Sequence, residues 1–141
     1  MQTFLPYPDF RKSLECLDYR RLGKQRVESK QIIDTLTGVS EGWKNHPAVK
    51  MWSGHVEALK TYYDWNLYIW EERGYRNIKL KPFRPCLFKH QYEILHGMPE
   101  WFGGDIHSSH RSALLYKKFE FYSQYGWTEE PKLDYVWPIG V

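Results

Sequence analysis

Hydrophobic side chains recur at three- and four-residue spacing along several long stretches of this chain, and this period predicts α-helices. The clearest stretch predicts a helix with Pro47 in its first turn and Gly74 just after its last turn. Nowhere do hydrophobic and polar residues alternate over a length that would indicate a half-buried strand. The pattern therefore predicts an all-α fold with three main helices.

The other two main helices are expected on either side of this one. The earlier helix is expected to begin near Ser13 or Asp18 and to end at Leu36. The later helix is expected to begin near Ser108, a candidate N-cap, and to reach Gly126.

The segments between the helices are typical of connections within one domain. The first dozen residues contain two prolines and predict an extended N-terminal arm. Residues 79–104 contain three prolines and predict a long irregular connection with a short helix near Tyr92. The aromatic tail after residue 130 is expected to pack back on the body. Because the chain has no repeat and no low-complexity tract, residues 1–141 are expected to form a single compact domain.

Composition and charge indicate a globular protein with a polyanionic partner. Hydrophobic residues make up 42% of the 141 positions and aromatic residues 18%. The net charge is only +3, yet residues 11–30 contain seven basic and three acidic residues. One basic segment in a nearly neutral chain is typical of a protein that docks one face on a polyanion.

Several other classes of protein are disfavoured. Two cysteines cannot form a disulfide framework, and the first residues lack the apolar run of a signal peptide. No stretch approaches the roughly 20 apolar residues of a membrane span. The six histidines lack the partners and spacing of a metal site. We expect a cytoplasmic monomer with no cofactor, no metal and no membrane attachment.

The segment around Glu28 raises the question of catalysis. On a helical projection Glu28 lies near Arg21 and Lys24 on a cationic face, at the edge of the apolar stripe. Its i,i+4 spacing from Lys24 fits an ordinary helix ion pair. A surplus of cations around one acid can instead hold phosphates while the acid acts on the group between them. From the residues alone both interpretations stay open.

Three segments, in order, resemble the pyrimidine-dimer DNA glycosylase superfamily, whose prototype is the phage endonuclease V. The segment RLGKQRVE resembles the family's first helix, in which a leucine precedes polar and basic residues and then the catalytic glutamate. The segment HPAVKMWSGHVEALKTYYDW, followed by ERGY, is similar to the family's run of Pro, Gly-His-Val, aromatic-Tyr-Asp and Arg-Gly-aromatic. The segment GGDIHSSHRSALLYKK, followed by YGW, resembles its Gly-Asp segment and the helix after it. The likeness is greatest to a bacterial and phage branch with starts like MQTFLPYPDF and ends like YVWP.

The resemblance implies a DNA glycosylase and abasic-site lyase whose partner is double-stranded DNA with a damaged or modified base. In such an enzyme an N-terminal α-amine attacks C1′ of the nucleotide, displaces the base and forms a Schiff base, and a glutamate assists β-elimination. The likeness assigns the glutamate to Glu28 and the amine to Met1. The chain departs from the prototype here, because Gln2 stands where the prototype has its threonine. The amine of Met1, an unusual processing of the start, and an absence of lyase chemistry therefore all stay open.

Further candidates for contact with DNA are basic, polar or aromatic side chains. The HSSHR segment at the start of a helix is suited to a phosphate, because helix N-termini present free amides. A tryptophan in a loop can stack on a base or wedge into a kinked duplex. The predicted contacts are Arg20, Arg21, Lys24, Arg26, His110, Arg111, Lys117 and Trp127.

Two other functions stay open at this point. One is a DNA-binding module of the same fold that lacks the chemistry. The other is an enzyme that acts on a free modified nucleotide, which the modest net charge favours. Steep salt dependence of binding to long DNA would argue against the free nucleotide, because only multiple phosphate contacts release many counterions.

Overall fold

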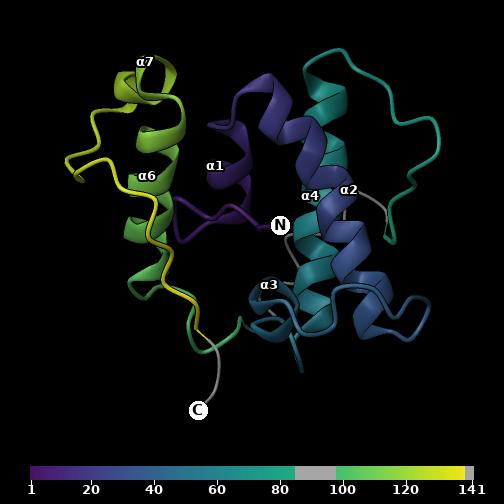
Figure 1. The fold of residues 1–141 in the computed structure, drawn as a ribbon. Coiled ribbons are helices and arrows are strands. Elements are labelled where there is room, and N and C mark those ends of the chain that lie inside the picture. Colours follow the sequence, from purple (N-terminus) through teal and green to yellow (C-terminus); the bar gives the residue numbers. More distant parts are fainter. Residues whose placement is uncertain (85–97, 139–141) are drawn as a thin grey trace.

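Helix α2 (Tyr19–Leu36) and helix α4 (Val56–Glu72) pack against each other and form the centre of the fold (Figure 1). The computed structural model describes residues 1–84 and 98–138, and every regular element in them is a helix. Helix α6 (Ile106–Lys117), the third long helix, lies on the other side of the N-terminal segment (Figure 1). The prediction of an all-α fold with three main helices is confirmed.

Shorter helices connect these elements. They are α1 (Phe10–Glu15), α3 (Pro47–Lys50) and α7 (Phe119–Tyr122). A 3-10 turn (Ser123–Tyr125) follows α7. Within residues 1–84 and 98–138, no helix combines the length and the apolar character that crossing a bilayer requires. The short helix predicted near Tyr92 falls outside the described residues.

The first main helix begins after its N-cap Asp18, the later of the two predicted starts, because α1 is separate and ends at Glu15. It ends at Leu36, as predicted. The single helix predicted from Pro47 to Gly74 was wrong: α3 ends at Lys50 and α4 begins at Val56. Between them Gly54 has a φ of +81°, which breaks the helix.

The third main helix also differs from its prediction. It begins after Asp105, ahead of the predicted start near Ser108, and ends at Lys117. Lys118 has φ −152° and ψ 69°, a non-helical conformation that separates α6 from α7.

Close approach of α2 and α4 depends on one glycine. A Cβ at Gly23 would lie 3.1 Å from ring atoms of Trp70, so a larger residue would push the helices apart or displace the ring. The guanidinium of Arg26 also lies over that ring, 4.2 Å from its centre. Gly23, which is unfavourable in the middle of a helix, is thus explained by packing.

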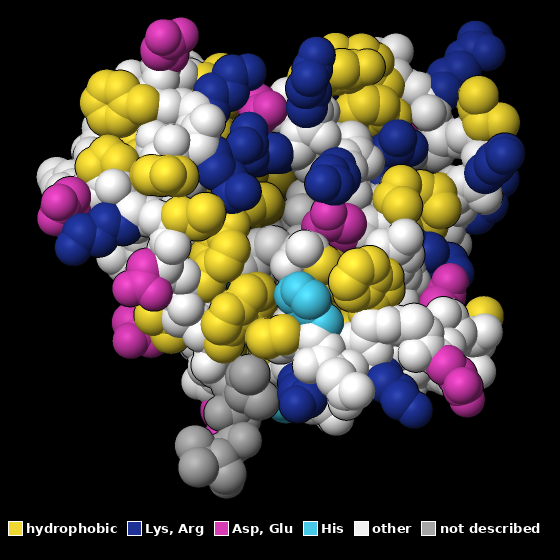
Figure 2. Space-filling model, in the orientation of Figure 1, with side chains coloured by type: hydrophobic (Ala, Val, Ile, Leu, Met, Phe, Trp, Pro, Cys, Tyr) yellow, Lys and Arg dark blue, Asp and Glu magenta, His cyan; other side chains and the backbone are white. Residues whose placement is uncertain are grey.

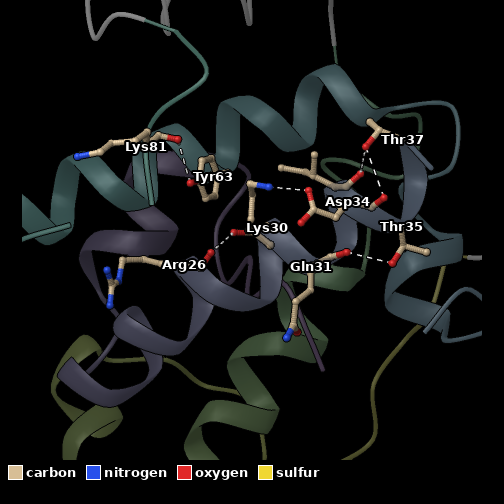
Figure 3. Close-up of polar contacts among 10 residues, drawn as sticks. Arg26, Lys30, Gln31, Asp34, Thr35, Thr37, Tyr63 and Lys81 are labelled. Carbon is tan, nitrogen blue, oxygen red and sulfur yellow. Dashed lines mark hydrogen bonds and ion pairs between the residues drawn. The ribbon is translucent and has the colours of Figure 1, made fainter. Parts of the chain in front are cut away.

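The side of α2 near its C-terminal end carries polar contacts that stabilise the fold (Figure 3). Lys30 Nζ lies 2.6 Å from Asp34 Oδ1, and the Thr37 hydroxyl donates to the carbonyl of Ile33. On the neighbouring helix the Tyr63 hydroxyl donates to the carbonyl of Lys81 at 3.0 Å, which ties the segment after α4 to that helix (Figure 3).

The start of the N-terminal segment is extended, as predicted, although α1 already begins at Phe10, within the dozen residues predicted to be extended. The segment runs through the interior rather than over the surface (Figure 1). Gln2, Thr3, Phe4 and Leu5 are all buried. The Thr3 hydroxyl accepts a 3.0 Å hydrogen bond from the indole nitrogen of Trp52. The segment therefore joins the α2–α4 pair to α6.

Two buried histidines of α6 hold Leu5 by both of its backbone groups. The Leu5 amide donates to Nδ1 of His110 at 2.8 Å, so the proton of this neutral ring is on Nε2. The Leu5 carbonyl lies 2.7 Å from Nδ1 of His107, whose Nε2 accepts from the Gly103 amide; the proton of His107 is therefore on Nδ1. Burial lowers the pKa of His110 to about 3 and lowers the pKa of His107 as well.

We predict that the free energy of unfolding falls on acidification. Unfolding lets His110 regain its ordinary pKa of about 6.5, so the unfolded chain binds more protons below that pH. From pH 7 to pH 5 the loss from His110 is about 2 kcal/mol. In H110N the amide oxygen can still accept from Leu5 but does not titrate, so urea unfolding at several pH values should show a flatter profile. An H110N profile parallel to that of the wild type would contradict this prediction.

Candidate active site

A cavity of about 340 Å³ opens between helix α2, the N-terminal segment and the end of helix α6. Four of the residues that line it are cations: Arg20, Arg21, Lys24 and Lys117. Figure 2 shows Lys and Arg side chains gathered around a hollow on this face of the molecule. The excess of positive charge makes the cavity suited to an anionic ligand.

Glu28 lies in the wall of this cavity, and its side chain is only 12% exposed. Its Oε2 accepts a 3.1 Å hydrogen bond from the backbone amide of Gln2 and a longer one from Nε2 of Gln25. Its Oε1 lies 3.6 Å from Nζ of Lys24, whose side chain is 74% exposed. The predicted i,i+4 ion pair between Lys24 and Glu28 is therefore present, but it contributes little to stability because the lysine is in solvent. The contact with Gln2 is what distinguishes this carboxylate.

Gln25 holds the N-terminal segment in front of Glu28. Its amide Nε2 donates to the carbonyl of Gln2 at 2.8 Å, and its Oε1 accepts from the amide of Phe4 at 2.9 Å. The same oxygen accepts from the hydroxyl of Tyr62, which is itself buried. Sequence analysis missed Gln25, although a signal existed: it is a polar residue within the apolar stripe of its helix.

Phe4 and Tyr135 form an aromatic part of the wall, with ring centres 6.3 Å apart. The tail that carries Tyr135 lies along α6, where the amide of Val136 donates to the Ser109 hydroxyl at 2.8 Å. Burial raises the pKa of Tyr135 to about 12, so its phenol is neutral. No local pattern in the sequence indicates that the tail reaches this cavity.

Arg21 is oriented by a buried acid. Its Nη1 lies 3.1 Å from Oδ1 of Asp18, which also accepts a hydrogen bond from the Tyr122 hydroxyl. Burial opposes ionisation of Asp18, but the hydrogen bonds from Tyr122 and Arg21 outweigh it and lower its pKa. The guanidinium is thus held at the cavity while Asp18 stays charged.

The structure brings six of the predicted site residues into this cavity and places the other four elsewhere. The six are Glu28, Met1, Arg20, Arg21, Lys24 and Lys117. Arg26 lies over Trp70 and donates to Asn77 at 2.7 Å. Trp127 stacks on the ring of Tyr122 and donates to the Tyr7 hydroxyl.

His110 and Arg111, predicted to contact phosphate, have partners within the protein. His110 is fully buried against Leu5. Arg111 donates to the Pro6 carbonyl at 2.7 Å and pairs with Glu129, which Ser108 also contacts. These contacts favour a structural role over the predicted contact with DNA. In the described part of the chain, no three His, Cys, Asp or Glu side chains are grouped as metal ligands.

A mostly buried carboxylate in a cavity ringed by cations suits a site that binds an anionic ligand. Residues 1–82 match the family model of pyrimidine dimer DNA glycosylase, and because this is more than half of the chain, the protein belongs to that family of DNA-repair glycosylases. No curated protein and no solved structure matches the chain. The match includes Glu28 and the N-terminal segment, whereas Lys117 and Tyr135 lie beyond it.

We predict that Q25L lowers the free energy of unfolding by about 2–4 kcal/mol, because it leaves the buried amide of Phe4 and the carbonyl of Gln2 without partners. Urea denaturation at constant pH measures the change. Q31L is the matched control, since Gln31 is exposed on the same helix, and it should change stability by less than about 0.5 kcal/mol. Equal effects of the two substitutions would contradict the role of Gln25.

Proposed function

We propose that this protein is a DNA glycosylase with abasic-site lyase activity, acting as a monomer on a damaged or modified base in double-stranded DNA. The observation that carries the proposal is the 3.1 Å hydrogen bond from the Gln2 amide to Glu28, inside a cavity lined by cations. It sets the start of the chain beside an acid at the place where a nucleotide's phosphates would be held.

In this mechanism the α-amine of Met1 is the nucleophile. The bond between its nitrogen and C1′ of the sugar forms as the bond from C1′ to the base breaks, and the base leaves with the electron pair. Loss of the amine proton and opening of the sugar give a Schiff base. Glu28 moves the protons of these steps and then removes a proton from C2′, which starts β-elimination of the 3′ phosphate.

The cations of the cavity wall would bind the phosphates on either side of the nucleotide. Arg20 and Arg21 present guanidinium groups at the start of α2, and Lys24 follows one turn later. Guanidinium groups match the geometry of phosphate oxygens. Binding at several phosphates explains why the positive charge of this chain is concentrated near one helix.

The central test is Glu28→Gln, assayed on duplexes that carry a pyrimidine dimer, one abasic site or no lesion. Intact mass establishes beforehand which residue carries the α-amine. Loss of the acid–base group should reduce base release and strand cleavage by at least about 100-fold, with binding changed little. E15Q is the control, because Glu15 is an exposed acid on α1 outside this cavity. Tight binding with no product from the wild-type protein would instead support a DNA-binding module.

A second prediction concerns salt. Among the described residues, the Arg20 side chain makes no hydrogen bond or ion pair with the protein, so it is free to bind phosphate. R20A should weaken binding to all duplexes and reduce the slope of log affinity against log salt by about 0.9. Removing Lys132, which pairs with Glu130, should not change the slope. A slope near zero for the wild type would favour the free-nucleotide function.

A further inference from the structure

The cavity contains a second lysine besides Lys24, and it comes from the opposite wall. Lys117 is the last residue of α6, and its side chain lines the cavity together with Met1 and Glu28. A sugar held against Glu28 would therefore lie in a space that the α-amine of Met1 shares with the ε-amine of Lys117. Two amines in one cavity raise the question of which one attacks.

Lys117 differs from the other cations of the cavity wall in its chemistry and in its partners. Arginine stays protonated in proteins and cannot act as a nucleophile at neutral pH. Lys24 is largely in solvent and is paired with Glu28. In the part of the chain that the structure describes, the Lys117 ammonium has no hydrogen bond and no ion pair. Lys117 is also exposed, but no acid within residues 1–84 and 98–138 is paired with its ammonium group.

The surroundings of Lys117 act on the pKa of its ammonium group. Partial burial of its side chain lowers the pKa of Lys117, and the nearby charges of Arg21 and Lys24 lower it further, against the opposite effect of Glu28. An amine placed next to other cations is one of the ways in which proteins produce a nucleophilic lysine. Both the position and the charge environment of Lys117 suit it to attack a carbonyl carbon.

We propose that Lys117 is a second nucleophile of this site and forms a Schiff base with the aldehyde of an abasic sugar. The proposal rests on the proposed function for its substrate. The neutral Nζ attacks C1′ of the open sugar, the carbonyl electron pair moves to oxygen, and proton transfer and loss of water give the protonated imine. Glu28 then takes a proton from C2′, and the electrons of that bond expel the 3′ phosphate by cleavage of its bond to C3′. Water finally hydrolyses the imine and frees Lys117.

This second amine makes the lyase chemistry independent of the residue that carries the α-amine. Gln2, which stands where the prototype has its threonine, places its backbone amide at Glu28. Lys117 lies beyond the segment that the family model matches, so it is a feature of this chain that the match does not assign. A lyase that uses Lys117 would work whether or not Met1 is retained.

The test is borohydride trapping on a duplex with one abasic site, followed by digestion and mass mapping of the modified residue. We expect an adduct on Lys117 that is lost in K117R, which keeps the positive charge. K118R is the matched control, because Lys118 is adjacent in sequence but does not line the cavity, and it should retain the adduct. Binding of the abasic duplex and the unfolding midpoint, measured for both variants, establish that K117R is folded and still binds.

The outcomes separate this inference from the proposed function. An adduct that maps only to the start of the chain overturns the role of Lys117 and leaves the proposed glycosylase and lyase in place. Loss of the Lys117 adduct in K118R as well, or adducts spread over surface lysines, also overturns it, since trapping would then be unspecific. Absence of any adduct, together with absence of base release and cleavage, overturns both proposals.

Discussion

The arrangement of this site depends on the hydrogen bonds that the buried amide of Gln25 makes with the start of the chain. The side-chain nitrogen of Gln25 donates to the Gln2 carbonyl, and its side-chain oxygen accepts from the Phe4 amide and from the Tyr62 hydroxyl. A buried backbone group without a partner costs about 1–3 kcal/mol, so a shift of the segment by one residue would be strongly unfavourable. Because Glu28 follows Gln25 by one helical turn, the same register brings the Gln2 amide to its carboxylate.

The N-terminal segment is held from the other side by α6. His107 and His110 use opposite tautomers to bind the two backbone groups of Leu5, and Arg111 binds the carbonyl of Pro6. The N-terminal segment therefore connects α6 to the α2–α4 pair. The contacts that stabilise the fold are the ones that bring Lys117, at the end of α6, across from Glu28. Stability and site geometry are coupled for this reason.

The cavity carries an excess of positive charge because its cations outnumber its acids. Among the described residues that line it, Glu28 is the one acid and faces four cations. Asp18 and Tyr122 hold Arg21 in place, and Lys24 pairs with Glu28 at the solvent side. The remaining positive charge is left for a ligand. Such a surplus suits an anionic ligand, and the phosphates of a nucleic acid are ligands of this kind.

The sequence by itself determined the helical class, the three main helices and the position of Glu28 beside Arg21 and Lys24, because periodic burial within one helix is visible in the residues of that helix. It did not reveal the break near Gly54, since the apolar period continues across it. Only the tertiary structure decided that the N-terminal segment is buried, that Lys117 and Tyr135 reach the cavity, and that His110 is a core residue. Those outcomes depend on which elements pack together, and contacts between residues about a hundred positions apart leave no local pattern in the sequence.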